Sequence, residues 1–203
     1  MRAYSLLIVA TCMLLWAAKP LTPDYGVGDT ASDFRLKNFD GKMVSLSDYR
    51  DSKGVILIFD CNTCPYSKAY NDRIIALHKD YASKGYPVVT INSNDGKQSP
   101  GDSFQEMISR AKNKNYDFPY LLDETQEVAR AFGATNTPHV FVLQREQNEF
   151  KVAYIGAIDN NSRNGSMASK KYVEDAVNSL LAGKPVPVEK TKAVGCGIKW
   201  KDV

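Results

Sequence analysis

The sequence predicts an α/β fold: a central mixed sheet, partly parallel, with helices covering both of its faces. Short apolar runs alternate with longer helical patterns, an order typical of sheets covered in this way. The chain has 203 residues, 43% of them hydrophobic, and can bury one core without metals or disulfides. The net charge of +3 is small, and no basic stripe indicates nucleic-acid binding. We therefore expect a single globular domain.

The first predicted strand and helix follow from apolar spacing. Val55–Phe59 is continuously apolar and predicts a buried strand. A helix is predicted over Pro65–Ala82, because apolar side chains three or four positions apart form one stripe and Pro65 suits a first turn. The stripe consists of Tyr66, Tyr70, Ile74, Leu77 and Tyr81. A second strand, Pro87–Asn92, precedes a loop rich in Asn, Gly, Ser and Pro.

The second half of the chain continues the alternation. Ser103 and Glu106 have the spacing of a capping box, which predicts a helix from there to about Lys114. Further elements are predicted at Tyr120–Leu122 (strand), Asp123–Gly133 (short helix), Val140–Leu143 and Val152–Ile155 (strands), and Lys170–Ala182 (helix). Gly183 is the residue type that commonly ends a helix. The remaining tail, 185–203, is predicted to be extended.

Two cysteines stand where the first strand meets the first helix. Cys61 and Cys64 are three positions apart, and Pro65 follows at once. Thiols with this spacing can close a small disulfide ring, and the positive end of a helix favours a thiolate. The sequence therefore predicts a redox centre in which Cys61 is the accessible thiol of low pKa and Cys64 the shielded one.

A CxxC pair can also be half of a zinc site or a structural disulfide. Zinc would need two further ligands, and the chain after residue 18 offers only Cys196, His78 and His139, none of them in a second CxxC or HxxxH pair. We therefore predict no metal and no cofactor. Asp60, directly before the pair, is either a proton acceptor for Cys64 or a strand residue that points away from the sulfurs.

A proline stands at the entrance of the predicted strand Val140–Leu143. Thr137-Pro138 alone would be read as an ordinary loop. Some 70 residues beyond a strand-CxxC-helix unit, however, it resembles the thioredoxin superfamily. The resemblance implies a thioredoxin-like fold, a cis peptide bond before Pro138, and a proline that faces the disulfide. It also implies that Thr137 and Pro138 present backbone polar groups to an extended substrate strand.

The resemblance narrows within the superfamily. Segments between Gly26 and Tyr49 look like the N-terminal β-hairpin of redoxin-type members, which are peroxiredoxins and the thioredoxins of the cell envelope. Gly195–Trp200 matches the Gly-Cys-x-Ile-Lys-Trp segment that ends a peroxiredoxin-like group, of the alkyl hydroperoxide reductase and thiol-specific antioxidant type. One departure matters: the peroxidatic Pro-x-x-x-Thr/Ser-x-x-Cys pattern is absent before both Cys61 and Cys64.

These features predict a thiol-disulfide oxidoreductase that works by dithiol/disulfide exchange at the CNTC motif. Cys61 would form a mixed disulfide with the substrate, and Cys64 would resolve it. Its partners would be protein thiols or disulfides and an upstream redox partner. Two alternatives remain open: a peroxiredoxin-like thiol peroxidase or antioxidant, and a non-catalytic binding protein of thioredoxin fold.

The first residues predict export. Arg2 precedes an apolar stretch from Ala3 to Ala18, which resembles a secretory signal and is short for a membrane span. We therefore divide the chain into a signal peptide or membrane anchor at 1–18, a redoxin domain at 21–184 and the tail at 185–203. The protein is expected to be periplasmic or otherwise extracytoplasmic, and to meet a membrane only through an uncleaved N-terminal segment.

Cys196 allows two interpretations. It is either a small hydrophobic residue that anchors the tail together with Ile198 and Trp200, or a third redox thiol that the tail carries back to Cys61 and Cys64. An odd cysteine in an exported protein makes the second interpretation worth testing.

Overall fold

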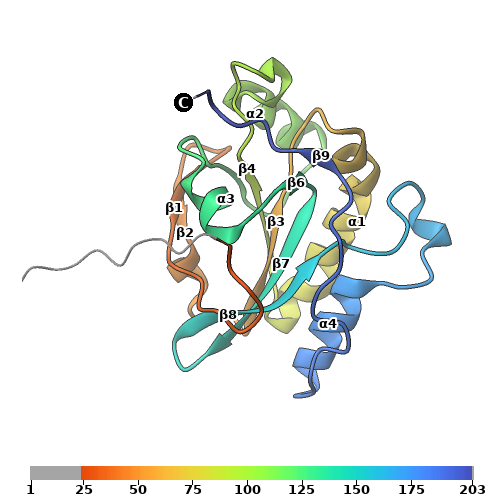
Figure 1. Cartoon of the computed structure of the whole chain (residues 1–203). Coiled ribbons are helices and arrows are strands. Elements are labelled where there is room, and N and C mark those ends of the chain that lie inside the picture. Colours follow the sequence, from red (N-terminus) through yellow and green to blue (C-terminus); the bar gives the residue numbers. More distant parts are fainter. Residues whose placement is uncertain (1–23, 203) are drawn as a thin grey trace, which may run out of the picture.

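The structure, a computed structural model, describes residues 24–202, so the predicted signal or anchor segment at 1–18 lies outside the described residues. A central sheet of seven strands has the order β2-β1-β5-β4-β3-β7-β8 (Figure 1). Its strands are β1 (Arg35–Asn38), β2 (Met43–Ser45), β3 (Gly54–Phe59), β4 (Val88–Asn92), β5 (Tyr120–Leu122), β7 (His139–Glu146) and β8 (Glu149–Gly156). The β3, β4 and β5 strands are parallel, and the other neighbours are antiparallel. The predicted mixed sheet with an N-terminal hairpin is confirmed.

Helices cover both faces of this sheet. They are α1 (Pro65–Tyr81), α2 (Phe104–Asn113), α3 (Glu127–Phe132) and α4 (Tyr172–Leu181). Alternate residues of β3 face opposite sides: Ile56 and Ile58 share a core with α1, α2 and α4, whereas Leu57 and Phe59 share the other core with α3. Because β3 is buried on both faces, its sequence is continuously apolar.

Gly54 begins β3 for a steric reason. A Cβ atom at this position would lie 2.2 Å from the carbonyl oxygen of Leu143 and 2.3 Å from the ring of Tyr86. Only glycine permits this close approach of β3 to β7 and to the segment before β4. At the other end of β3 the chain enters α1, whose N-cap is Cys64 and whose first residue is Pro65. The predicted strand-CxxC-helix unit is therefore present.

Three local expectations need correction. The β7 and β8 strands are longer than predicted, because they continue past the apolar core as a hairpin whose turn residues Gln147 and Asn148 have φ of 50° and 87°. Ser103 is the N-cap of α2, but its side chain makes no capping hydrogen bond, so the predicted capping box does not form. The tail is not merely extended, because it contributes a strand of its own.

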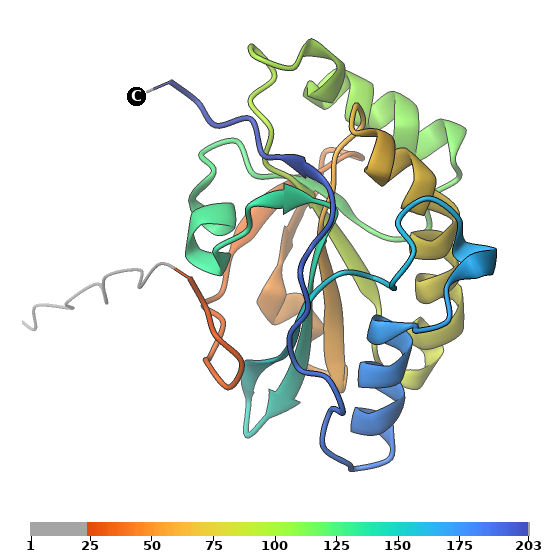
Figure 2. The same cartoon turned by 45° about the vertical axis from the view of Figure 1, so that its right-hand side comes forward.

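That strand, β9 (Cys196–Gly197), pairs antiparallel with β6 (Asn136–Thr137) in a separate two-stranded sheet. The tail runs from α4 along β8, where Lys190 bridges Ile155, and then reaches β6 past the beginning of α1 (Figures 1 and 2). The tail lysines, Lys190, Lys192, Lys199 and Lys201, are exposed, as expected of a solvated face. Within residues 24–202, no helix has the length and apolar character needed to span a bilayer.

Candidate functional site

Cys61 and Cys64 lie in the turn that joins β3 to α1, and Asp102 holds this turn in place. The carboxylate of Asp102 accepts hydrogen bonds from the backbone N–H groups of Asn62 at 2.6 Å and Thr63 at 2.9 Å, and from the Thr63 hydroxyl at 2.7 Å. Burial alone would raise the pKa of Asp102, but hydrogen bonds, beginning with that from Ser99, outweigh it and lower the pKa. The sequence reasoning missed Asp102, because nothing local connects it to a motif 40 residues earlier.

Thr137 contacts both sulfur atoms. Its hydroxyl lies 3.1 Å from the Sγ atom of Cys61, and its carbonyl oxygen lies 3.1 Å from the Sγ atom of Cys64. The peptide bond between Thr137 and Pro138 is cis, as the resemblance implied. The structure therefore brings together the four residues that the sequence singled out.

The predicted accessibility of Cys61 is wrong in this structure. Cys61 is 1% exposed and Cys64 is 2% exposed. The reason is tertiary: Thr137 lies against both sulfurs, and the partner of Thr137 in the two-stranded sheet is Cys196 of the tail. The redox site is therefore closed in this structure, with the tail paired to Thr137 beside the thiols.

In this closed state the surroundings of the two sulfurs favour the thiolate of Cys64. A hydrogen bond with Cys61 lowers the pKa of Cys64 to about 4, and hydrogen bonds from the Cys196 side chain and from backbone N–H groups act in the same direction. The same sulfur–sulfur contact, together with burial, raises the pKa of Cys61. Burial and the contact with Cys64 raise the pKa of Cys196 to about 11. Cys64 thus lies between two thiols that favour its thiolate.

Asp60 forms a buried ion pair behind the turn. Its Oδ2 atom accepts a hydrogen bond from Nη2 of Arg110 at 2.9 Å, and Arg110 also donates to the carbonyl oxygen of Cys61. Burial raises the pKa of Asp60, while the Arg110 charge opposes that shift. The Oδ1 atom has no hydrogen-bond partner among the described residues. Asp60 and Arg110 together fix the backbone at Cys61, which supports the structural interpretation of Asp60.

His139 follows the cis-proline and is 8% exposed. Burial, with a further contribution from the nearby charge of Lys190, lowers the pKa of His139 to about 4. Its Nδ1 atom accepts a hydrogen bond from the N–H of Thr135 at 3.4 Å. His139 is therefore neutral near neutral pH and does not act on the thiols through a charge. Among residues 24–202, no group of three or more His, Cys, Asp or Glu side chains has an arrangement that could hold a metal ion.

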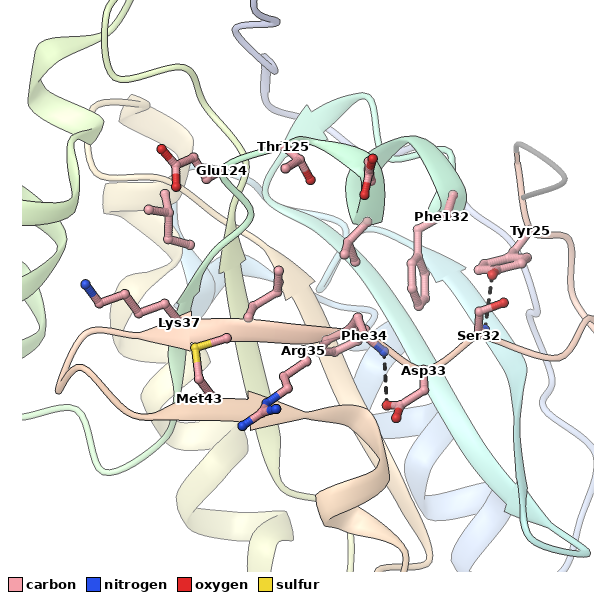
Figure 3. Close-up of a pocket in the computed structure, with 15 residues that line it drawn as sticks. Tyr25, Ser32, Asp33, Phe34, Arg35, Lys37, Met43, Glu124, Thr125 and Phe132 are labelled. Carbon is pink, nitrogen blue, oxygen red and sulfur yellow. Dashed lines mark hydrogen bonds between the residues drawn. The ribbon is translucent and has the colours of Figure 1, made fainter. Parts of the chain in front are cut away.

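A groove of about 440 Å³ lies between the N-terminal hairpin and α3 (Figure 3). Phe34 and Phe132 form part of its apolar wall, and Arg35, Lys37 and Glu124 add charged groups at its rim. No cysteine lines it. The groove is therefore separate from the redox centre.

Comparison with known proteins places the chain in a family. A family model described as the AhpC/TSA family matches residues 27–152, which include the CNTC motif and Pro138. The chain belongs to this family. The predicted membership of the thioredoxin superfamily, in its redoxin branch, is thereby confirmed, and the thioredoxin-like fold is confirmed by the structure and its neighbours.

Relatives of two kinds share the family. Thiol-disulfide oxidoreductase ResA of Geobacillus thermodenitrificans is 27% identical over 129 residues, 62% of this chain and 68% of that protein. The putative peroxiredoxin bcp of Helicobacter pylori J99 is 30% identical over 108 residues, 53% of this chain and 66% of that protein. The crystal structure of an uncharacterized conserved protein from Geobacillus kaustophilus has a TM-score of 0.81 and 38% identity, covering 88% of this chain and 94% of that one. The relatives' names agree with the predicted enzyme class, an oxidoreductase.

Proposed function

We propose that this protein is a thiol-disulfide oxidoreductase that exchanges disulfides with protein substrates through Cys61 and Cys64. The observation that carries the proposal is the arrangement of both sulfurs at the N-terminal end of α1, each 3.1 Å from an oxygen atom of Thr137, beside the cis-proline. The helix end favours a thiolate at this position. Its kinship with proteins named thiol-disulfide oxidoreductase supports the same reaction.

The reaction requires a defined order of bonds. The thiolate of Cys61 attacks a substrate disulfide, forms a mixed disulfide, and releases one substrate thiolate. The Cys64 sulfur then attacks Cys61, which closes the Cys61–Cys64 disulfide and releases the second substrate thiolate. The surroundings favour these roles once the tail is displaced: the Thr137 hydroxyl can donate a hydrogen bond to a thiolate at Cys61, whereas the Thr137 carbonyl oxygen accepts a hydrogen bond from a thiol at Cys64.

Trapping the mixed disulfide tests this order. The Cys64→Ser variant, mixed with a disulfide-containing model protein, should accumulate a covalent complex through Cys61, because the resolving thiol is missing. The matched Cys61→Ser variant should accumulate much less. Equal trapping by the two variants would reverse the roles, and the absence of trapping and of exchange by the unaltered protein would refute the proposal.

A thiol peroxidase is the second candidate function. The observation in its favour is the Thr137 hydroxyl next to the Cys61 sulfur, because a hydroxyl near the reactive cysteine also belongs to the peroxidatic pattern that the sequence lacks. Kinship with a putative peroxiredoxin points the same way. Stopped-flow oxidation of the reduced protein by hydrogen peroxide decides between the two. A rate constant near that of free cysteine supports exchange, and one many orders of magnitude higher supports a peroxidase.

A non-catalytic binding protein would keep the fold and use the Cys61–Cys64 disulfide only as a structural cross-link. The reduction potential of this pair separates the cases. A value between roughly −270 mV, as in thioredoxin, and −120 mV, as in DsbA, fits an exchange enzyme and also shows whether it reduces or oxidises its substrates. A potential well below −300 mV is typical of structural disulfides.

We also propose that the protein is exported and works with an upstream redox partner. The support is the sequence of residues 1–18, with Arg2 before an apolar stretch. Cell fractionation of the full chain, compared with a variant in which Leu14→Arg interrupts the apolar stretch, tests the export. The unaltered protein should be extracytoplasmic and the variant should stay in the cytoplasm.

A further inference from the structure

The tail approaches the redox centre as a paired strand. Cys196 is the Cα partner of Thr137, and Gly197 is the partner of Asn136. The approach is tight: a Cβ atom on Gly195 would lie 2.2 Å from the carbonyl oxygen of Thr137, so only glycine fits there. The backbone edge beside the cis-proline is thus occupied by the chain's own residues.

Residues after Cys196 hold the tail in this position. Ile198 is buried in the core beside α3, and its N–H donates to the carbonyl oxygen of Thr135 at 3.1 Å. The guanidinium of Arg130 lies 4.5 Å from the centre of the Trp200 ring. The backbone of Lys199 is bonded at both ends: its N–H donates to Asn94 at 2.8 Å, and its carbonyl oxygen accepts from the N–H of Asp95 at 2.8 Å.

The side-chain amide of Gln126 makes two hydrogen bonds to the end of the tail. Its Nε2 atom donates to the carbonyl oxygen of Lys199 at 2.8 Å, and its Oε1 atom accepts from the N–H of Lys201 at 2.8 Å. Gln126 is 1% exposed, and its backbone has a φ of 64°, which residues other than glycine rarely adopt. Gln126 has a strained backbone, and its buried side chain bonds to the tail and to the carbonyl oxygen of Ser93 at 2.6 Å, so the docked tail is a built feature of the fold.

Docking places three thiols in one cluster. Cys196 pairs with Thr137, whose hydroxyl and carbonyl oxygen contact the Sγ atoms of Cys61 and Cys64, and directly opposite residues of an antiparallel pair project from the same face. Cys196 remains partly exposed, whereas Cys61 and Cys64 are buried. All three cysteines are free in this structure. Antiparallel partners have Cα atoms about 4.5–5.5 Å apart, so the strand pairing brings Cys196 within reach of the sulfurs that Thr137 contacts.

We propose that Cys196 is a third redox thiol, which takes over the disulfide of the Cys61–Cys64 pair by forming a Cys64–Cys196 bond, and that the tail segment 190–202 occupies the substrate edge beside Thr137. This inference rests on the proposed function and adds to it an internal substrate. The tail then competes with external substrates, and the new disulfide holds it closed over the site.

The transfer step balances without an external reagent. The Cys196 thiol loses its proton, and its sulfur attacks Cys64 in the Cys61–Cys64 disulfide. The Cys64–Cys196 bond forms, the Cys61–Cys64 bond breaks, and Cys61 leaves as a thiolate that takes up a proton. One disulfide and one thiol are present before and after the step, so no electrons leave the chain.

Disulfide mapping of the full-length protein tests the transfer. The reduced protein is oxidised stepwise with glutathione disulfide, quenched with acid, alkylated and digested with trypsin. Cys61 and Cys64 share the tryptic peptide 54–68, and Cys196 lies on 193–199, so a bridge to Cys196 links two peptides. We expect this linked pair in the unaltered protein and a larger yield in Cys61→Ser, where Cys64 has no other partner.

The outcomes separate the inference from the proposed function. If Cys196 stays alkylatable in every oxidised state of both proteins while the unaltered protein exchanges disulfides with a substrate, the inference fails and the function stands. If the linked peptides form but no substrate is exchanged, the proposed function fails and the internal transfer stands.

A substitution of Gln126 tests whether docking of the tail is required for the burial of the thiols and for the transfer of the disulfide. Gln126→Ala removes two hydrogen bonds to the tail and one to Ser93, without altering a cysteine. We expect the alkylation rate of the reduced Cys61–Cys64 pair to rise about tenfold, the effect of roughly one net hydrogen bond, and the yield of linked peptides to fall. Gln105→Ala, at an exposed site on α2, is the matched control and should change neither. Equal rates and yields in all three proteins would overturn the role of the docked tail.

Discussion

At the scale of single residues, Thr137 supplies a hydrogen-bonding group to each of the two thiols. Its hydroxyl lies beside the Cys61 sulfur and its carbonyl oxygen beside the Cys64 sulfur, both at 3.1 Å. A hydroxyl can donate to a thiolate, whereas a carbonyl oxygen can only accept. One residue thus offers opposite hydrogen-bonding partners to two otherwise similar sulfurs.

Replacing Thr137 by Val removes the hydroxyl and keeps a β-branched side chain. We expect disulfide exchange to slow about tenfold, because the Cys61 thiolate loses a donor worth roughly 1–1.5 kcal/mol. The exchange rate with a model disulfide protein, followed as a function of pH, measures this effect. Thr135→Val is the control, because Thr135 is exposed and, within residues 24–202, its hydroxyl bonds only to Asn136. An unchanged rate and pH profile in Thr137→Val would remove the hydroxyl from the mechanism.

The shifted thiols also make stability depend on pH. The pKa of Cys64 is lowered to about 4 in the fold, below its value in the unfolded chain, and the pKa of Cys61 is raised. Between pH 4 and the unfolded thiol pKa of about 8.5, both thiols of the unfolded chain carry a proton, whereas in the folded reduced protein only Cys61 does. The unfolded chain therefore binds one proton more over this range. Stability of the reduced protein should therefore rise from pH 4 toward the unfolded thiol pKa of about 8.5 and be lost as the pH falls through 4.

Urea unfolding of the reduced protein from pH 4.5 to 8, with Cys64→Ser as reference, measures this contribution. The difference in unfolding free energy between the two proteins should grow with pH. A difference that does not change with pH would show that neither thiol is ionised in the folded protein over this range.

At the scale of elements, the turn between β3 and α1 depends on a buried acceptor from the next loop. Asp102 is fully buried and satisfies the N–H groups of Asn62 and Thr63. These N–H groups precede the N-cap of α1 and belong to no helix or strand, and burial makes each unsatisfied donor costly. The loop before α2 therefore shapes the redox turn across 40 residues of sequence.

Asp102→Ala should destabilise the protein by about 3 kcal/mol, because it leaves several buried donors and a cavity. It should also slow disulfide exchange, since the Cys61–Cys64 turn loses its anchor. Asp102→Asn keeps an oxygen acceptor and should recover part of both losses. Thermal unfolding and exchange kinetics on the three proteins test this, and full activity in Asp102→Ala would show that the turn holds its shape unaided.

A second ion pair ties α1 to the segment after β8. Arg73 donates to Asp159 at 2.5 Å, and the Tyr70 hydroxyl donates to the other carboxylate oxygen at 3.1 Å. Asp159→Ala should lower the free energy of unfolding by about 3 kcal/mol, because it leaves the largely buried guanidinium of Arg73 without its carboxylate partner. Glu174→Ala, which breaks an exposed pair with Lys171, should cost under about 1 kcal/mol in the same urea experiment. Equal costs would mean that burial adds nothing to the first pair.

At the scale of the whole molecule, the docked tail adds to the groups that favour the thiolate of Cys64. In the docked state, the hydrogen bond with Cys61 contributes most to the lowered pKa of Cys64, and the Cys196 side chain and backbone add to it. Displacing the tail removes these donors and leaves Cys64 facing the Thr137 carbonyl. The closed protein and the open protein should therefore differ in their reactive sulfur.

The pH profile of iodoacetamide alkylation, read by peptide fragmentation, tests this difference. In the unaltered reduced protein, the first thiol modified at low pH should be Cys64. In Gln126→Ala, whose tail is loosened, Cys61 should take that place. The same order of modification in both proteins would show that the tail does not control the ionisation.

The sequence by itself determined the central architecture and the identity of the reactive groups. The apolar β3 strand, the CNTC motif at the start of α1 and the proline before β7 are each local patterns, because buried strands, helix starts and strand entrances select residue types within a few positions. Only the tertiary structure decided that the thiols are buried, that Asp102 anchors their turn, and that Cys196 lies beside Cys64. These contacts join residues 40 to 132 positions apart, and pairing over such separations depends on how the packed core brings the segments together, which no local pattern encodes.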